Sequence, residues 1–146
     1  MDSTCIACSK HWPSDDHRIA DCGTSVAYLF GDQFFPGWTV LVLKRHASEL
    51  FELSADERRR LIEEVSMVAE ALKEAFRAVK INYELLGNQV SHIHWHIIPR
   101  LTSDPLPRDP VWTVRHEKQT LTPSDLADRV ALIRSRLGLK IMHDPR

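Results

Sequence analysis

The chain has 146 residues, of which 43% are hydrophobic and 27% charged, and its formal net charge is −1. A chain of this length and apolar content is expected to fold as one domain, residues 1–146, around a buried core. The near-neutral charge argues against a nucleic-acid-binding surface, and no apolar run approaches the roughly 20 residues of a membrane span.

The amino terminus and the cysteines favour a cytoplasmic location. Residues 1–5 contain neither the basic nor the apolar segment of a secretory signal. The cysteine count is 3, an odd number that does not suggest a disulfide framework. Cys5 and Cys8 have the two-residue spacing typical of a zinc knuckle, whereas Cys22 is expected to be a small buried hydrophobic residue.

Two strands joined by a turn are predicted after the first 24 residues. Residues 25–30 and 38–44 are apolar runs of strand length, and residues 31–37 between them carry glycines and a Pro–Gly pair. Asp32 lies in this turn, where an acidic residue is common for conformational reasons alone.

A long amphipathic helix is predicted from Ser54 onward. Ser54 and Glu57 have the spacing of a capping box, in which each side chain bonds the backbone N–H of the other residue. Apolar residues then recur with the helical period, and the charged residues between them are expected to face solvent. The predicted buried stripe consists of Leu61, Val65, Val68, Leu72, Phe76 and Val79.

Residues 82–86 and 92–98 are predicted to form a pair of strands. In the second of these, His92, His94 and His96 alternate with apolar residues. A strand has a side-chain period of two, so the three imidazoles share one face, about 6.6 Å apart, while the apolar residues point to the other face. As a helix, the same run would spread the three rings in different directions.

Three interpretations of these histidines compete. In the first, one imidazole attacks an electrophile while its neighbours handle protons and charge. In the second, two or three of them bind a metal ion. In the third, they are polar residues on a solvent-facing strand, although three on one face make this the least favoured interpretation.

The last part of the chain is predicted to be a loop and a helix. Residues 102–110 contain three prolines and are expected to form the loop. A helix begins at Thr122–Pro123 and is expected to end at Gly138. Its inward residues are predicted to be Leu126, Val130, Ile133 and Leu137. The predicted class is α+β, an antiparallel sheet with helices on one face.

The run from His92 to Ile98 resembles the pattern of the histidine triad (HIT) family, His-x-His-x-His-x-x with x apolar. Residues 36–46 and 87–90 are also similar to segments of that family, and the cysteine pair resembles a bacterial branch similar to diadenosine polyphosphate hydrolases. The resemblance implies a HIT core over about residues 5–100, followed by a loop and helix over 101–146. It also implies a homodimer in which the two sheets join into one.

The resemblance assigns the chemistry to two of the histidines. It implies that His94 attacks the α-phosphorus of a nucleotide, for which neutral imidazole is a good nucleophile. The other ring nitrogen of His94 then needs a carbonyl acceptor, expected on residues 82–86. The resemblance also implies that His96 protonates the leaving group, with contact to a phosphate oxygen as the alternative.

Substrate contacts are implied for three polar residues. Asp32 resembles the residue that holds the ribose hydroxyls, although a simple turn residue is the alternative. Asn88 and Gln89 lie in the approach to the triad, where polar groups are expected to hold the anion. Many family members carry Ser or Thr where this chain has Gln89. Phe30 and Phe34 are candidates for a base pocket, but aromatic residues at such positions more often belong to the core.

A structural zinc site is the further implication of the resemblance, which extends here to galactose-1-phosphate uridylyltransferases. The implied ligands of Zn²⁺, in a closed tetrahedral site, are Cys5, Cys8, His46 and His92. The alternatives are a pair of free thiols or a site completed by His11 and His17.

The predicted function is hydrolysis of nucleotides through a covalent His94–nucleotide intermediate, without a catalytic cofactor. Expected substrates are phosphoanhydrides and phosphoramidates of nucleoside monophosphates, such as dinucleoside polyphosphates and adenosine phosphoramidate. The alternatives are nucleotidyl transfer to a phosphate acceptor, a nucleotide-binding adaptor with little turnover, and a zinc hydrolase that uses all three histidines. The expected partners are the nucleotide and a second copy of the chain, with neither nucleic acid nor membrane.

Overall fold

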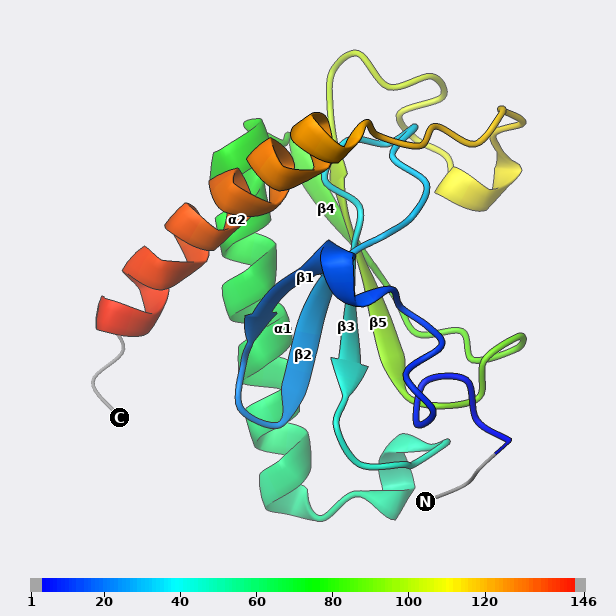
Figure 1. Ribbon diagram of the computed structural model, residues 1–146, viewed down its shortest axis with the longest axis vertical. Coiled ribbons are helices and arrows are strands. Elements are labelled where there is room, and N and C mark those ends of the chain that lie inside the picture. Colours follow the sequence, from blue (N-terminus) through cyan, green and yellow to red (C-terminus); the bar gives the residue numbers. More distant parts are fainter. Residues whose placement is uncertain (1–3, 144–146) are drawn as a thin grey trace.

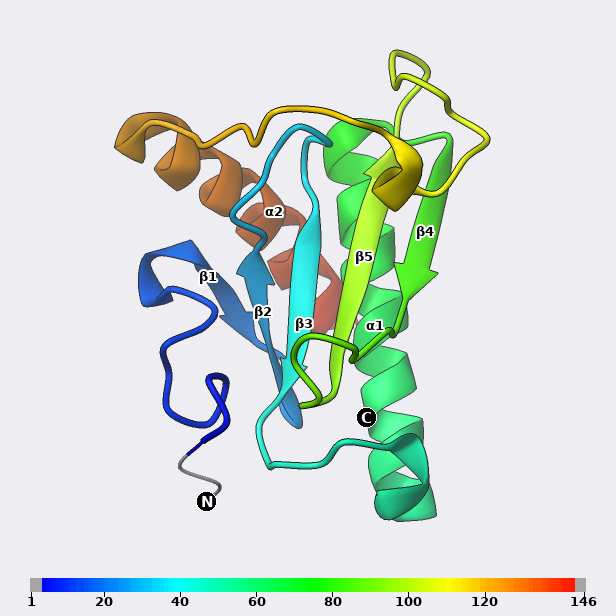
Figure 2. The same ribbon diagram turned by 90° about the vertical axis from the view of Figure 1, so that its right-hand side faces the viewer.

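One antiparallel sheet covered by two long helices on a single face makes up the protein (Figures 1 and 2). The computed structural model describes residues 4–143, with side chains to residue 138. The sheet has five strands in the order β1-β2-β3-β5-β4. Their bounds are Arg18–Asp21 for β1, Ser25–Leu29 for β2, Thr39–Leu43 for β3, Lys80–Glu84 for β4 and His94–Arg100 for β5. The predicted α+β class, with an antiparallel sheet and helices on one face, is confirmed.

Helix α1, Ala55–Phe76, begins at the predicted capping box. The backbone N–H of Glu57 donates to the Ser54 hydroxyl at 3.2 Å, and the backbone N–H of Ser54 donates to the Glu57 carboxylate at 2.7 Å. The helix ends when Arg77 turns into the left-handed region at φ 52°. Val79 therefore lies outside the buried stripe and is 60% exposed, so the prediction for that residue was wrong.

The carboxy-terminal helix α2, Pro123–His143, packs on α1 and β1. It runs through Gly138 rather than ending there, so the predicted stop was wrong. A glycine only weakens a helix by about 1 kcal/mol, and it marks an end only where the backbone turns left-handed. Three short 3₁₀ helices complete the structure, at Asp15–His17, Leu50–Glu52 and Val111–Thr113.

The main core lies between the sheet and the two helices. The inward residues Val130, Ile133 and Leu137 of α2 belong to the same buried cluster as the stripe of α1. Helix α2 thus shares one buried core with the sheet and α1. The predicted domain, 1–146, also includes residues 1–3 and 144–146, which lie outside the described part of the chain.

A second, smaller cluster lies on the other face of the sheet. Its buried members are Phe35, Trp38, Ile98 and Val111. Phe30 and Phe34, for which a core position was favoured over a base pocket, pack against this cluster and are partly buried. Phe30 also lines the cavity on this face. The segment that follows β5 crosses back over this face, so residues after position 100 help to build the site.

A buried arginine fixes that crossing segment. Arg100, at the end of β5, is 2% exposed and pairs with Asp104 at 2.9 Å. Its guanidinium also donates to the Asn82 side chain and to the backbone carbonyl of Asp109, each at 2.7 Å. These bonds hold the loop that leads to Trp112. No helix in the described part of the chain is both long enough and apolar enough to cross a bilayer.

Candidate active site and metal cluster

A cavity of about 600 Å³ lies on the sheet face that carries the second cluster. Its walls come from the amino-terminal segment, the β2–β3 turn and the segment around Trp112. His94 and His96 lie directly behind this wall, and each is 5% exposed. The ring of Trp12 covers His94 at 5.0 Å between centroids, and the ring of Trp112 covers His96 at 5.3 Å.

The backbone places both catalytic candidates on one face, as the alternation predicted. In the β3–β5 register, Val42 is opposite His94 and Val40 is opposite His96. Their two rings lie 5.0 Å apart at 76°. The apolar residues that alternate with them, Ile93, Trp95 and Ile97, belong to or pack against the main core on the other face. His92 precedes the strand, which begins at His94 and not at the predicted residue 92.

The protonation state of His94 follows from its hydrogen bond. Its Nδ1 lies 2.7 Å from the backbone carbonyl of His92, and a carbonyl only accepts, so Nδ1 carries the proton. The acceptor therefore lies two residues before His94 in the chain, and the expectation that it lies in residues 82–86 was wrong. Burial lowers the pKa of His94 below its ordinary value. The ring is thus neutral near pH 7, with a lone pair on Nε2.

His96 is held in the opposite tautomer to His94. The indole N–H of Trp38 donates to His96 Nδ1 at 3.0 Å, so this nitrogen is unprotonated and Nε2 carries the proton. The pKa of His96 is lowered to about 4, mainly because the ring is buried and to a lesser extent because His94 is nearby. Two neutral imidazoles with complementary tautomers therefore lie side by side, one with a free lone pair and one with a free N–H.

The low pKa of His96 predicts that acid destabilises the fold. In the unfolded chain this imidazole takes up a proton near pH 6.5, whereas the folded protein resists until about pH 4. The unfolded state binds more protons in between, so the free energy of unfolding is expected to fall by up to about 3 kcal/mol as pH drops through this range. Urea unfolding of wild type and His96→Gln at several pH values measures the effect. The free energy of unfolding of the variant should depend clearly less on pH than that of wild type. Equal pH dependence in the two proteins would contradict the prediction.

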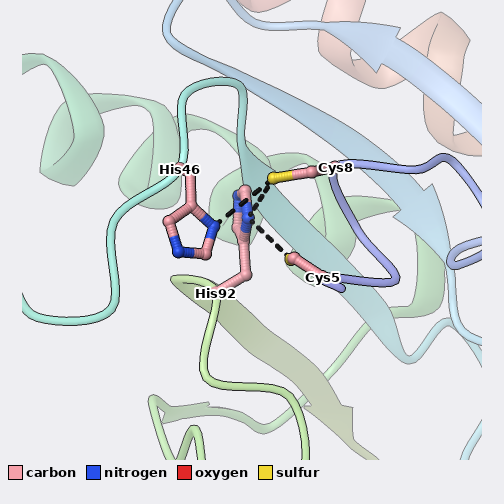
Figure 3. A group of neighbouring side chains, drawn as sticks. All are labelled: Cys5, Cys8, His46 and His92. Atoms are coloured by element: carbon pink, nitrogen blue, oxygen red, sulfur yellow. Dashed lines mark hydrogen bonds between the residues drawn. The ribbon is translucent and has the colours of Figure 1, made fainter. Parts of the chain in front are cut away.

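Two cysteines and two histidines, one of them His92, form a group of possible metal ligands (Figure 3). The Sγ atoms of Cys5 and Cys8 each lie 3.5 Å from His92 Nδ1, and Cys8 Sγ lies 3.4 Å from His46 Nδ1. One donor atom from each of these four residues falls within 4.8 Å of all the others. His11 and His17, the alternative candidates, do not belong to this cluster.

The donor set suits a zinc ion. His92 Nε2 lies 2.6 Å from the carbonyl oxygen of Leu43, so Nε2 carries the proton and the lone pair of Nδ1 is directed at the cysteines. Zinc bonds of about 2.3 Å to sulfur and about 2.0–2.1 Å to nitrogen, in a tetrahedron, separate N and S ligands by roughly 3.6 Å. The observed N–S distances of 3.4 and 3.5 Å are close to this value.

Asp32 lies at the cavity and joins it to the segment after Trp112. Its Oδ1 accepts the backbone N–H groups of Phe34 and Gln119, each at 3.0 Å, and its Oδ2 lies 2.8 Å from His116 Nε2. Although partial burial raises the pKa of Asp32, these hydrogen bonds outweigh it and hold the pKa below the ordinary value. Sequence reasoning did not foresee the partner His116, whose ring also stacks on Phe34 at 4.1 Å.

Asn88 and Gln89 lie in the β4–β5 loop and are exposed. Neither side chain makes a hydrogen bond to the other described residues, and neither lines the cavity. Asp32 therefore lines the cavity, and His94 and His96 lie behind its aromatic wall, whereas Asn88 and Gln89 do not line it. The aromatic walls from Trp12, Trp38 and Trp112 were missed, because nothing in their sequence spacing indicates a shared site.

Comparison with known proteins places this geometry in a family. A family model described as HIT domain matches residues 13–103. An uncharacterized HIT-like protein of Methanocaldococcus jannaschii is 35% identical over 72 residues, which are 47% of this chain and 56% of that protein. The adenosine 5′-monophosphoramidase of Schizosaccharomyces pombe is 27% identical over 84 residues, which are 57% of this chain and 63% of that enzyme. The matches thus span little more than half the length of these relatives.

Solved structures agree with the sequence comparison. The crystal structure of a histidine triad protein from Marinobacter aquaeolei has a TM-score of 0.77 and 29% sequence identity, covering 84% of this chain and 89% of that one. The matched family model spans more than half of the 146 residues and includes the three alternating histidines. The chain belongs to the HIT domain family.

Proposed function

We propose that this protein hydrolyses nucleotides at the α-phosphorus through a covalent intermediate on His94. The observation that carries the proposal is the bond from His94 Nδ1 to the His92 carbonyl, because it leaves the Nε2 lone pair free on a neutral ring. A neutral imidazole is a stronger nucleophile than water at neutral pH. The similarity to an adenosine 5′-monophosphoramidase supports a nucleotide substrate.

The reaction would proceed in two displacements. In the first, His94 Nε2 forms a bond to the α-phosphorus, and the bond to the leaving group breaks with its electron pair on that group. The cation that forms on the imidazole is stabilised by the Nδ1–H bond to the His92 carbonyl. In the second, water attacks phosphorus, the N–P bond breaks, and the electron pair returns to Nε2. The products are a nucleoside monophosphate, the leaving group and a proton released to solvent.

Labelled water and rapid quenching test this proposal. With a dinucleoside polyphosphate or adenosine phosphoramidate as substrate, intact mass measurement should detect one nucleotidyl adduct, and peptide mapping should locate it on His94. In ¹⁸O-water, hydrolysis places one ¹⁸O atom in the released nucleoside monophosphate. Formation of a nucleoside diphosphate from added phosphate would instead identify nucleotidyl transfer. Turnover with no adduct at any quench time would overturn the mechanism.

The remaining substrate contacts are proposals from the resemblance. Asp32 is proposed for the nucleoside side, since it lines the cavity, and Asn88 and Gln89 for the phosphate side. The carboxylate of Asp32 already accepts two backbone N–H groups and meets His116, so any ribose hydroxyl would share it with these partners.

We further infer that Cys5, Cys8, His46 and His92 hold a structural Zn²⁺. Bound there, the ion would supply a cross-link between the amino-terminal segment and the sheet. The four donors are of the types that zinc prefers, and their spacing fits a tetrahedral site. Trp12 follows Cys8 by only four residues and covers His94, so this cross-link would also support the cavity wall.

Metal removal is therefore expected to destabilise the protein. The variant Cys8→Ser should lose the metal found by elemental analysis of wild type, near one zinc per chain, and unfold at a lower temperature. The loss is worth about 4 kcal/mol when free zinc exceeds its dissociation constant a thousandfold. Cys22→Ala, a buried cysteine outside the cluster, is the matched control and should keep its zinc. Wild type without metal, or full zinc in the Cys8 variant, would refute the site.

We also propose the homodimer that the resemblance implies. Strand β4 is an edge of the described sheet, paired only with β5. Large apolar side chains are exposed along and beside it, with Tyr83 at 48%, Leu86 at 55% and Val79 at 60%. Such an edge is suited to pairing with a second copy. Light scattering should give the mass of two chains, and a single-chain mass would contradict the proposal.

A cytoplasmic location remains a proposal as well. Among the described residues, Cys5, Cys8 and Cys22 form no disulfide, which is compatible with a reducing compartment.

A further inference from the structure

The bond between Trp38 and His96 restricts what His96 is able to do. Both side chains are buried, at 2% and 5% exposure, and the indole N–H donates to Nδ1 at 3.0 Å. An indole nitrogen is only a donor, so Nδ1 of His96 must be the acceptor. The imidazolium form would place a second N–H against the indole N–H, with two donors facing one another in a buried site.

The surroundings of His96 offer little to stabilise a positive charge. The rings of Phe30, Trp38 and Trp112 surround it at 5.3 to 5.6 Å. Glu84 is opposite His96 in the register of β4 and β5, and its carboxylate accepts the indole N–H of Trp112. The neighbouring ring, His94, directs its own N–H at a backbone carbonyl. Among the described residues, no carboxylate accepts a hydrogen bond from His96.

We propose that Trp38 keeps His96 a neutral hydrogen-bond donor, so that the site favours nucleotides joined to their leaving group by a phosphoanhydride bond over phosphoramidates. This inference rests on the proposed function and names its substrate class. Trp38 acts here as a positioning residue. Its contact selects one tautomer of His96 and thereby excludes that side chain as a general acid.

The preference follows from where the electron pair goes. When a phosphoanhydride P–O bond breaks, the pair stays on an oxygen of a phosphate that is a stable anion at neutral pH, and the Nε2–H of His96 needs only to donate a hydrogen bond. When a P–N bond breaks, the nitrogen must receive a proton. A neutral imidazole that gave up its Nε2–H would become an imidazolate, so that proton has to come from water. The missing general acid is worth about 10²–10⁴ in rate.

Competing substrates that release the same nucleotide test the preference. Wild type should show a kcat/KM for diadenosine triphosphate about 10²-fold or more above that for adenosine phosphoramidate. Trp38→Phe keeps an aromatic ring and removes the N–H donor, so His96 becomes free to take up a proton on Nδ1. In this variant, the ratio of kcat/KM for diadenosine triphosphate to kcat/KM for adenosine phosphoramidate should fall about tenfold or more. Turnover of the phosphoramidate should rise as the pH is lowered. Trp95→Phe is the matched control, because this tryptophan packs against the core on the opposite face of β5 and its indole N–H bonds no other described residue. It should leave the ratio within about threefold.

The tautomer is also measurable without turnover or substitution. In wild type at neutral pH, ¹⁵N NMR of the His96 ring should show an unprotonated Nδ1 and a protonated Nε2. An imidazolium, or a proton on Nδ1, would overturn the inference whatever the variants do.

The kinetic results distinguish failure of the substrate preference from failure of the proposed function. Equal kcat/KM values for the two substrates, each with a His94 adduct, would overturn the inference and leave the proposed function standing. Absence of adduct and of turnover with both substrates would overturn the proposed function itself.

Discussion

Replacement of His94 by alanine is expected to reduce turnover by at least about 10³-fold while nucleotide binding survives. The variant removes the only atom proposed to bond to phosphorus, whereas the aromatic walls that bound the cavity remain. Besides the ring contacts to Trp12 and His96, the substitution removes the hydrogen bond from Nδ1 to the His92 carbonyl. Initial-rate assays at saturating substrate give kcat, and titration calorimetry with a non-hydrolysed nucleotide analogue gives the dissociation constant.

His17→Ala is a matched control for this experiment. His17 also faces the cavity, and its Nδ1 lies 2.9 Å from a backbone carbonyl, that of Leu29, as His94 Nδ1 does with His92. Loss of His17 is expected to lower kcat by less than about tenfold, because it makes no bond to phosphorus. Comparable loss in both variants, or full activity in His94→Ala, would disprove the assigned nucleophile.

Asp104→Ala is expected to produce the largest loss of stability, about 3–5 kcal/mol. The substitution leaves the guanidinium of Arg100 buried without its carboxylate partner, and both side chains are nearly inaccessible, at 3% and 4% exposure. The same carboxylate accepts the backbone N–H of Leu101 at 3.0 Å. Because this network holds the loop that leads to Trp112, the cavity wall should also loosen. Urea unfolding at neutral pH measures the change.

Asp56→Ala provides the exposed counterpart. Asp56 pairs with Arg59 at 2.6 Å, but the two side chains are 73% and 75% exposed, so the expected cost is within about 0.5 kcal/mol. A double variant, Arg100→Met with Asp104→Leu, should recover much of the loss because it removes both charges from the interior. A small effect of Asp104→Ala, equal to that of Asp56→Ala, would show that the buried pair is not essential to the fold.

Local patterns in the sequence predicted the elements that depend on neighbouring residues. The alternation of His92, His94 and His96 required a strand, and the structure confirms a shared face for the last two, with His92 just before it. The capping box at Ser54 required a helix start, because both of its bonds close within four residues. The short strand β1 was missed, since four residues carry too little alternation to distinguish a strand from a loop.

Contacts between residues far apart in the sequence could not be predicted from such local patterns. Trp38 and His96 are 58 positions apart, and Asp32 and His116 are 84 apart, so no spacing rule links them. Arg100 was expected to mark the end of the resemblance, yet it is buried at the centre of a network with Asp104. An arginine at the end of a strand is normally solvated, and only the fold shows that this one is enclosed.

The sequence by itself determined which residue types stand on one strand face, and the family resemblance supplied the four candidates for a metal cluster. Covalent spacing and side-chain period decide only the first of these, since they act over a few residues. Only the tertiary structure decided the proton positions on His94 and His96, because each depends on a partner, the His92 carbonyl or the Trp38 indole, whose placement the whole sheet fixes. The chemistry of the two imidazoles therefore differs although their residue type is the same.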